Sequence, residues 1–359
     1  MLLKNTGFFK PTVSFDGQSS KSNFYGNRET EQQITKFDTK YFKNRTKILS
    51  LLTKQNATSI SKSDITTLLE STQFQRERTL TFRDSEKGVR DFYEDFFIPQ
   101  LEDLESYDSG HPPEVTEAIQ KGMAHVMASL SDPKATQHFR LMRIRTSRNQ
   151  VSDLKPLILK NKTNRPFIFS DSPVSYANPA LRSYKCSKLA NNSLGLQILY
   201  PLNSEFLVFF YDPEAYEIQH PRRGIILDIT DENDINQINK LQIHEAFNAI
   251  YFTNPEDKNY VEKIWHQEKH RLQRKAKTVD LVNNLTPDGN STGTKTYAIS
   301  ESEPTFYPDF RFLLIKDLSK SYIPYRTKYI PKADGVATKQ LNDLIDRYPE
   351  SPDANIEEP

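Results

Sequence analysis

Asp171 is the residue whose type and position most directly indicate chemistry. It follows the apolar residues 167–169 in a Ser-Asp-Ser-Pro turn, where Pro173 has a fixed φ and biases Ser172 toward an extended backbone. A carboxylate held in this way at the edge of a core is suited to act as a general base, as a metal ligand or as the partner of an arginine. The alternative is a structural turn, in which the carboxylate accepts hydrogen bonds from backbone amides.

Gln75 and Arg78 complete this predicted site. They are three residues apart in a segment expected to be helical, so both side chains lie on one side of the helix. If that side faces the turn, Arg78 and Asp171 form a charge-assisted pair that organises a polar pocket. The alternative is a structural ion pair that joins a helix to the sheet. We predict Asp171, Gln75 and Arg78 as candidate catalytic residues, with Mg²⁺ as the candidate cofactor.

Two basic segments are candidates for contact with nucleic acid. Residues 266–277 form a strongly charged helix end beside Trp265, whose ring is suited to stacking. In residues 140–148, two arginines lie on the same face of an expected strand, where they are compatible with phosphate contacts. The alternative for the first segment is a solvated helix end whose cations suit the helix dipole. The residues predicted to contact nucleic acid are Arg143, Arg145, Lys269, Arg271, Arg274 and Lys275.

Several other classes of site find no support in the sequence. The formal net charge is +1, so any preference for nucleic acid, membrane or an acidic partner has to be local. His266 and His270 have the spacing of two ligands on a helix, but the cations around them disfavour a divalent ion, and we predict no metal ligands. GxxxxGK, GxGxxG and GxSxG motifs are absent, which argues against ATP, NAD and GxSxG-hydrolase functions. The single cysteine, Cys186, is typical of a reducing compartment.

Both helices and strands are expected to position these residues. Apolar residues recur every three or four positions in much of the first third of the chain, and Ser61 to Asp64 supply N-cap residues. β-branched and aromatic stretches bounded by turn residues follow, joined by connections too short for crossover helices, so an antiparallel sheet is expected. Helices are expected at about 29–54, 64–80, 84–104, 114–130, 233–252 and 255–277, and strands at about 138–146, 157–159, 167–169, 196–200, 206–211 and 224–229.

The predicted fold class is α+β. An N-terminal helical layer, at about 29–130, packs on a small, mainly antiparallel sheet, at about 137–230, and two further helices occupy about 233–277. Residues 1–278 are expected to form one core domain. Residues 279–359 are expected to be a linker and a partly disordered C-terminal extension with a short ordered segment at about 305–318, because Gly, Asn, Ser and Thr are frequent at 283–296 and the end is polar.

The location of the protein is predicted from what the sequence lacks. No run of about eighteen apolar residues is present, so no transmembrane helix and no membrane partner are expected. The N-terminal residues have too short an apolar stretch for a signal peptide and no small-residue cleavage site. We therefore expect a cytoplasmic protein.

The order of five motifs is recognisable. They are Phe24-Tyr25, Gln75-Arg76-Glu77-Arg78-Thr79, Phe167 to Val174 (Phe-Ile-Phe-Ser-Asp-Ser-Pro-Val), Ile198 to Leu202 (Ile-Leu-Tyr-Pro-Leu) and the expected helix that carries Asn248 to Tyr251. In this order the chain resembles the bacterial family called domain of unknown function 4238 over about residues 1–270, with Ser172 where the family usually has Asn. The resemblance implies an intracellular bacterial protein with a mixed helical and sheet core, and it implies no established activity.

Two functions are compatible with these observations. The first is a toxin-like or phage-defence effector with metal-dependent nuclease or phosphodiesterase activity at Asp171. The second is a non-catalytic module that binds protein or nucleic acid, in which Asp171 and Arg78 are structural. The sequence leaves open whether the protein is an enzyme. Replacement of Asp171 distinguishes the two, because it would impair activity in the first case and folding in the second.

Overall fold

The structure is a computed structural model of the chain. It describes residues 1–11, 25, 28–54, 59–92, 94–95, 132–184, 188–220, 222, 224–273, 275–285, 291–318 and 325–329. The helix expected at 114–130 and most of the second half of the helix expected at 84–104 lie outside these ranges, as do Phe24, Cys186 and Arg274.

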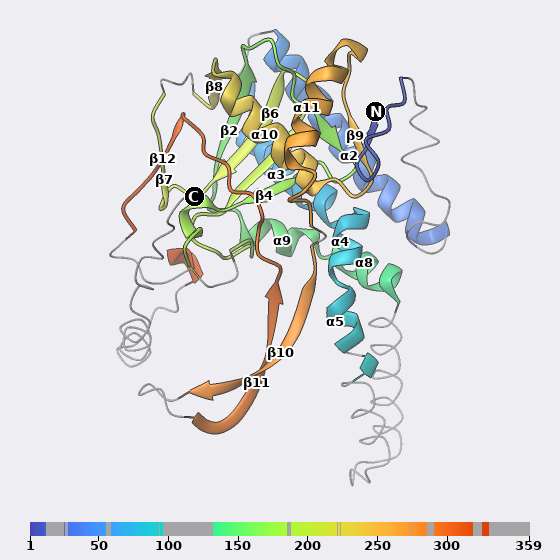
Figure 1. Ribbon diagram of the computed structural model, residues 1–359, viewed down its shortest axis with the longest axis vertical. Coiled ribbons are helices and arrows are strands. Elements are labelled where there is room, and N and C mark those ends of the chain that lie inside the picture. Colours follow the sequence, from blue (N-terminus) through green and yellow to red (C-terminus); the bar gives the residue numbers. More distant parts are fainter. Residues whose placement is uncertain are drawn as a thin grey trace.

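A five-stranded sheet forms the centre of the fold (Figure 1). Neighbouring strands are antiparallel, except that β2 and β8 are parallel. The mainly antiparallel sheet expected from the short connections is therefore confirmed. In order across the sheet, the strands are β4 (Ser175–Ala177), β5 (Gln197–Pro201), β6 (Phe206–Tyr211), β2 (Lys155–Asn161) and β8 (Ile226–Ile229).

Both faces of this sheet are covered by helices. Alternate residues of a strand point to opposite faces, and in β6 Leu207 and Phe209 pack with α10 (Glu232–Glu245), whereas Val208 and Phe210 pack with two N-terminal helices. All residues of β5 and β6 are buried. Burial on both faces explains why these strands are continuous apolar runs in the sequence rather than alternating ones.

The N-terminal helical layer consists mainly of α2 (Arg28–Thr53) and α3 (Lys62–Glu77). Ser61 caps α3, since its hydroxyl accepts from the Asp64 amide while the Asp64 carboxylate accepts from the Ser61 amide. This cap confirms the start predicted from the sequence. Two short helices, α4 (Leu80–Ser85) and α5 (Lys87–Phe92), continue the chain.

The prediction of a strand at 138–146 is wrong, because this region is helical. It forms α8 (Pro133–Met142) and α9 (Ile144–Gln150). Asp132 caps α8 and Pro133 occupies its first turn, a strong helix start. The buried residues Gln137, Leu141 and Ile144 recur at intervals of four and three, which is a helical period that the alternation of apolar and basic residues conceals.

The helix expected at 233–252 ends earlier, at Glu245. Residues 249–251 form β9 (Ala249–Tyr251), which pairs antiparallel with β1 (Leu2–Leu3) and with β3 (Phe169–Ser170) in a three-stranded sheet. Against this sheet packs α11 (Lys258–Glu268), a helix that stops well before the expected residue 277. The N-terminus thereby reaches the same part of the molecule as α10 and α11.

A β-hairpin stands where the sequence predicted a linker. Strands β10 (Lys277–Leu285) and β11 (Ser291–Glu301) pair antiparallel and extend away from the central sheet (Figure 1). Val279 lies opposite Ile299, and Leu281 lies opposite Tyr297. These alternating β-branched, apolar and aromatic residues are the strand signal that the surrounding polar composition obscured.

The last described segment returns to the main body. β12 (Leu313–Ile315) pairs with β7 (Tyr216–Ile218), and Phe310 and Phe312 enter the core beneath α10. Arg326 is fully buried, and it contacts Asp153 and three backbone carbonyls. Short 3-10 helices occur at Pro179–Leu181, Pro255–Asp257 and Thr327–Tyr329.

The arrangement is an α+β fold, as predicted. Within the described ranges, no helix combines the length and the apolar character needed to cross a membrane.

Candidate functional site

Asp171 directly follows β3 and accepts hydrogen bonds from three consecutive backbone amides. Its Oδ1 atom is 2.8 Å from the nitrogen of Phe247, and its Oδ2 atom is 2.8 Å and 3.2 Å from the nitrogens of Asn248 and Ala249. Burial raises the pKa of Asp171 from its ordinary value, and the three amide bonds oppose that increase. Both oxygens are thus engaged with the peptide that joins α10 to β9. This geometry corresponds to the structural alternative, with amides supplied by a distant segment rather than by the turn itself.

Arg78 does not pair with Asp171, so the predicted ion pair is wrong. The Arg78 guanidinium binds Asp38 of α2, and its Nε donates to the Tyr25 hydroxyl at 3.0 Å. These interactions tie the end of α3 to α2. Gln75 is half-buried on α3.

The end of α3 and the turn are nevertheless close together. Thr79 Oγ1 lies 3.5 Å from Ser172 Oγ. The condition set by the sequence argument is therefore met, but Asp171 and Arg78 bind other partners, because the backbone groups and helices around them determine where their side chains point.

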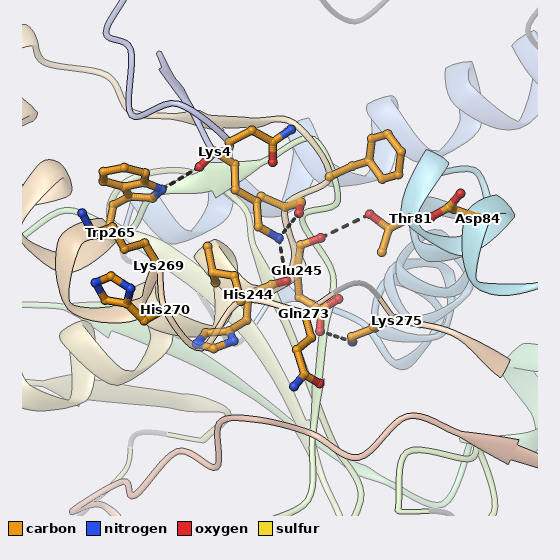
Figure 2. Close-up of a pocket in the computed structure, with 14 residues that line it drawn as sticks. Lys4, Thr81, Asp84, His244, Glu245, Trp265, Lys269, His270, Gln273 and Lys275 are labelled. Atoms are coloured by element: carbon orange, nitrogen blue, oxygen red, sulfur yellow. Dashed lines mark hydrogen bonds and ion pairs between the residues drawn. The ribbon is translucent and has the colours of Figure 1, made fainter.

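A pocket of about 510 Å³ opens beside this region (Figure 2). The N-terminal segment, α4, the end of α10 and the end of α11 with its following loop form the walls. Phe247, whose amide binds Asp171, belongs to one wall. Asp171 thus supports the pocket from behind by fixing the backbone at its edge.

Three lysines line this pocket: Lys4 from the N-terminal segment, and Lys269 and Lys275, which both follow α11. Lys4 Nζ donates to the carbonyls of His244 and Ala246. Two of the three, Lys269 and Lys275, are residues that the sequence predicted for contact with nucleic acid.

The other two lysines differ in their surroundings. Lys275 forms an ion pair with Glu245, which is 5% exposed. Lys269 is exposed, and its Nζ lies 5.4 Å from the centroid of the Trp265 ring. Lys269 therefore presents its charge at the pocket mouth, next to His270, without a carboxylate partner among the ion pairs of the described residues.

Trp265 is a wall of the pocket rather than a free stacking surface. Its indole nitrogen donates to the Lys4 carbonyl at 2.8 Å, and only 8% of the residue is exposed. Gly7 has a φ of +69° and lies against the ring, where an added Cβ would be 2.7 Å from two ring carbons. The Trp265 ring therefore packs within the protein and does not provide the stacking surface that the sequence predicted.

The remaining predicted cations lie elsewhere. Arg271 donates to the Thr305 carbonyl at 2.8 Å. Arg143 and Arg145 are exposed around the junction of α8 and α9, and they do not share a strand face, because there is no strand. Arg274 lies outside the described residues.

Among the residues that the structure describes, no group of three or more His, Cys, Asp or Glu side chains is arranged to hold a metal ion. His270 lines the pocket mouth, and His266, four residues earlier, is exposed beside Trp265. No described site for Mg²⁺ accompanies Asp171.

Sequence reasoning missed Arg76, His244 and Glu245. The guanidinium of Arg76 stacks on Tyr176, 3.9 Å from the ring centroid, and also lies 5.5 Å from the Phe82 ring. Arg76 belongs to the motif of residues 75–79, so a structural role for it could have been inferred from the sequence. His244 and Glu245 fall at the end of an amphipathic helix, and nothing in the residue pattern marks them, because their partners come from other segments.

The fold and site define an α+β protein with a lysine-lined pocket between its N-terminus and its last helices. A family model described as Protein of unknown function (DUF4238) matches residues 2–256. The chain belongs to this family, which confirms the resemblance found in the sequence. No match was found among curated proteins or among solved structures.

Proposed function

We propose that the protein is a binding module for nucleic acid, and that the pocket between α4, α10 and α11 holds one nucleotide unit at a time. The observation that carries the proposal is that Lys4, near the N-terminus, lines one cavity together with Lys269 and Lys275, which both follow α11. Its volume of about 510 Å³ falls in the range of small-molecule sites.

The exposed cation at the mouth would contact phosphate. Lys269 is the residue best placed for this role, because it is exposed and carries no described ion pair, whereas Lys275 is already paired with Glu245. A lysine acts on phosphate as a point charge and contributes affinity that falls with salt. The small net charge of the chain makes this a local effect.

Asp171 and Arg78 serve this function as structural supports. Both are bound within the protein, Asp171 to the backbone of residues 247–249 and Arg78 to Asp38. This favours the binding function over hydrolysis at Asp171. The other function, that of a cytoplasmic bacterial effector with metal-dependent nuclease activity in phage defence, stays a prediction from the sequence.

The test uses the full chain and fluorescein-labelled single-stranded RNA and DNA oligonucleotides, with binding measured by fluorescence anisotropy over a range of salt concentrations. Lys269→Glu should weaken binding by about tenfold or more and reduce the slope of log affinity against log salt by about one. Lys263→Glu is the matched control. Lys263 is an exposed lysine of α11, the helix that ends next to Lys269, and it does not line the pocket. Equal effects of the two substitutions, or no binding by the wild-type protein, would contradict the proposal.

A further inference from the structure

A hydroxyl, an imidazole and a carboxylate form a continuous chain beside the pocket. Thr305 Oγ1 is 3.2 Å from His244 Nδ1, and His244 Nε2 is 3.0 Å from Glu268 Oε2. The three residues come from the last turn of α10, the end of α11 and the segment before β12. A nucleophile bonded to a base, with the base bonded to an orienting acid, is the general geometry of an activated hydroxyl.

The charge states of the imidazole and the carboxylate suit these roles. Glu268 is 2% exposed and lies 2.9 Å from Lys240 Nζ. Burial opposes its ionisation, but hydrogen bonds from His244 and Lys240 outweigh burial and lower the pKa of Glu268. Burial lowers the pKa of His244, against the opposing effect of Glu268. A neutral imidazole that donates from Nε2 to an ionised Glu268 has Nδ1 free to accept the Thr305 proton.

The ring is also held in place. Phe306 stacks on His244 with ring centroids 5.3 Å apart and an angle of 15° between the planes. Stacking on one side and hydrogen bonds at both nitrogens fix the orientation of the imidazole, which is the requirement for a base that acts on one particular hydroxyl.

Thr305 and His244 face a second, smaller cavity of about 50 Å³. Such a volume holds a few water molecules, or an acyl group with two or three heavy atoms. Lys275 and Gln273 line both this cavity and the larger pocket, and Figure 2 shows both residues close to Glu245. Their ammonium and amide groups are donors suited to an oxygen that becomes negative during reaction.

We propose that Thr305 and His244 are catalytic residues, with Glu268 as the positioning residue, for hydrolysis of a short-chain acyl ester of an anionic alcohol. The small cavity receives the acyl group, and the larger pocket with Lys269 at its mouth receives the alcohol part. This activity goes beyond nucleic-acid binding and does not depend on it. The absence of a GxSxG motif does not argue against this activity, because Thr305, His244 and Glu268 lie on separate segments and come together only in the folded chain.

The reaction runs in two balanced steps. In the first, Thr305 Oγ attacks the ester carbonyl, its proton moves to His244 Nδ1, the bond to the alcohol oxygen breaks, and the imidazolium returns the proton to that alcohol. In the second, water gives a proton to His244 and attacks the acyl-threonine carbonyl, the bond from the acyl carbon to Thr305 Oγ breaks, and the imidazolium returns the proton to Oγ, which releases the carboxylic acid and restores the Thr305 hydroxyl. Glu268 remains ionised throughout and stabilises the imidazolium.

The experiment measures hydrolysis of p-nitrophenyl acetate and p-nitrophenyl octanoate by the full chain. Wild type should hydrolyse the acetate in preference to the octanoate, and Thr305→Val should lower the acetate rate by about a hundredfold or more. Thr305→Ser should restore turnover, because serine supplies the same hydroxyl. Thr146→Val, which changes an exposed threonine on α9, is the control and should match wild type.

Two further measurements separate catalysis from a structural role. Intact-mass and peptide analysis after mixing should place one acetyl group on Thr305, and the melting temperatures of the Thr305 and Thr146 variants should match that of wild type. Glu268→Gln should move the acidic limb of the pH–rate profile to lower pH, because His244 loses the nearest negative charge while Lys4, Lys240, Arg271 and Glu245 stay in place. Equal rates for wild type and Thr305→Val, absence of turnover by wild type, or acetylation confined to lysines would each overturn the proposal.

Discussion

Replacing Asp171 by asparagine tests the structural role of the central motif. The carboxylate binds three amides with two oxygens, one on Oδ1 and two on Oδ2. Asparagine keeps a single oxygen. When that oxygen takes the Oδ2 position, the amides of Asn248 and Ala249 stay bound, and the new NH₂ group faces the amide of Phe247, so that a donor meets a donor.

The expected cost follows from these contacts. A hydrogen bond to a charged group contributes about 1.5–3 kcal/mol, and a buried donor left without a partner costs about 1–3 kcal/mol. Asp171→Asn should therefore lower the free energy of unfolding by about 2–3 kcal/mol. Asp171→Ala removes all three bonds and should cost about 3–5 kcal/mol.

Equilibrium unfolding in urea, monitored by circular dichroism, measures both changes. Asp309→Asn is the matched control, because Asp309 is exposed, and its effect should stay within about 0.5 kcal/mol. Asp171→Asn could instead change the free energy of unfolding no more than this control does, while abolishing oligonucleotide binding or a catalytic activity. That result would refute the structural role of Asp171 and support a direct functional role.

Three other expectations follow from buried contacts. Arg326→Leu should lower the free energy of unfolding, measured in urea, by about 3–5 kcal/mol, because it removes the buried guanidinium that binds Asp153 and three carbonyls, and an unchanged midpoint would contradict this. Gly88→Ala should speed hydrogen exchange in β10 and β11, because an added Cβ would stand 2.1 Å from the Lys277 carbonyl oxygen; unchanged exchange would show that α5 does not hold the hairpin in this way. His244 has a lowered pKa, so its contribution to stability is present above its unfolded-state value of about 6.5 and is lost as the pH falls below it. The loss of unfolding free energy between about pH 7.5 and 5.5 should consequently be smaller in His244→Asn than in wild type, and equal losses would rule out this role of His244.

Much of the fold could be predicted where local signals agree with tertiary packing. The cap at Ser61 and the apolar period of α2 are properties of neighbouring residues, so these elements follow from the sequence. The error at residues 138–146 arose because Leu141 and Ile144 fit a helical period while the arginines around them imitate strand alternation. The hairpin was missed because its polar composition outweighed the alternation of Val279 and Leu281.

The candidate site shows the same division more sharply. The sequence singled out Asp171, Arg78, Lys269 and Lys275, and it left open whether the end of α3 meets the turn, which the contact between Thr79 and Ser172 shows. It could not show that Asp171 binds the backbone of residues 247–249. That contact coincides with the end of α10, since amides given to Asp171 are not available for a longer helix.

By itself the sequence determined the α+β class, the family, the start of α3 and the presence of a basic segment after Trp265, because capping, apolar periodicity and local charge depend on residues close together in the chain. Only the tertiary structure decided which charges pair, where the pocket lies and that Thr305, His244 and Glu268 form one chain of hydrogen bonds. Hydrogen bonds and ion pairs act over about 3 Å, so their partners are chosen by the packing of helices and strands and not by spacing along the sequence.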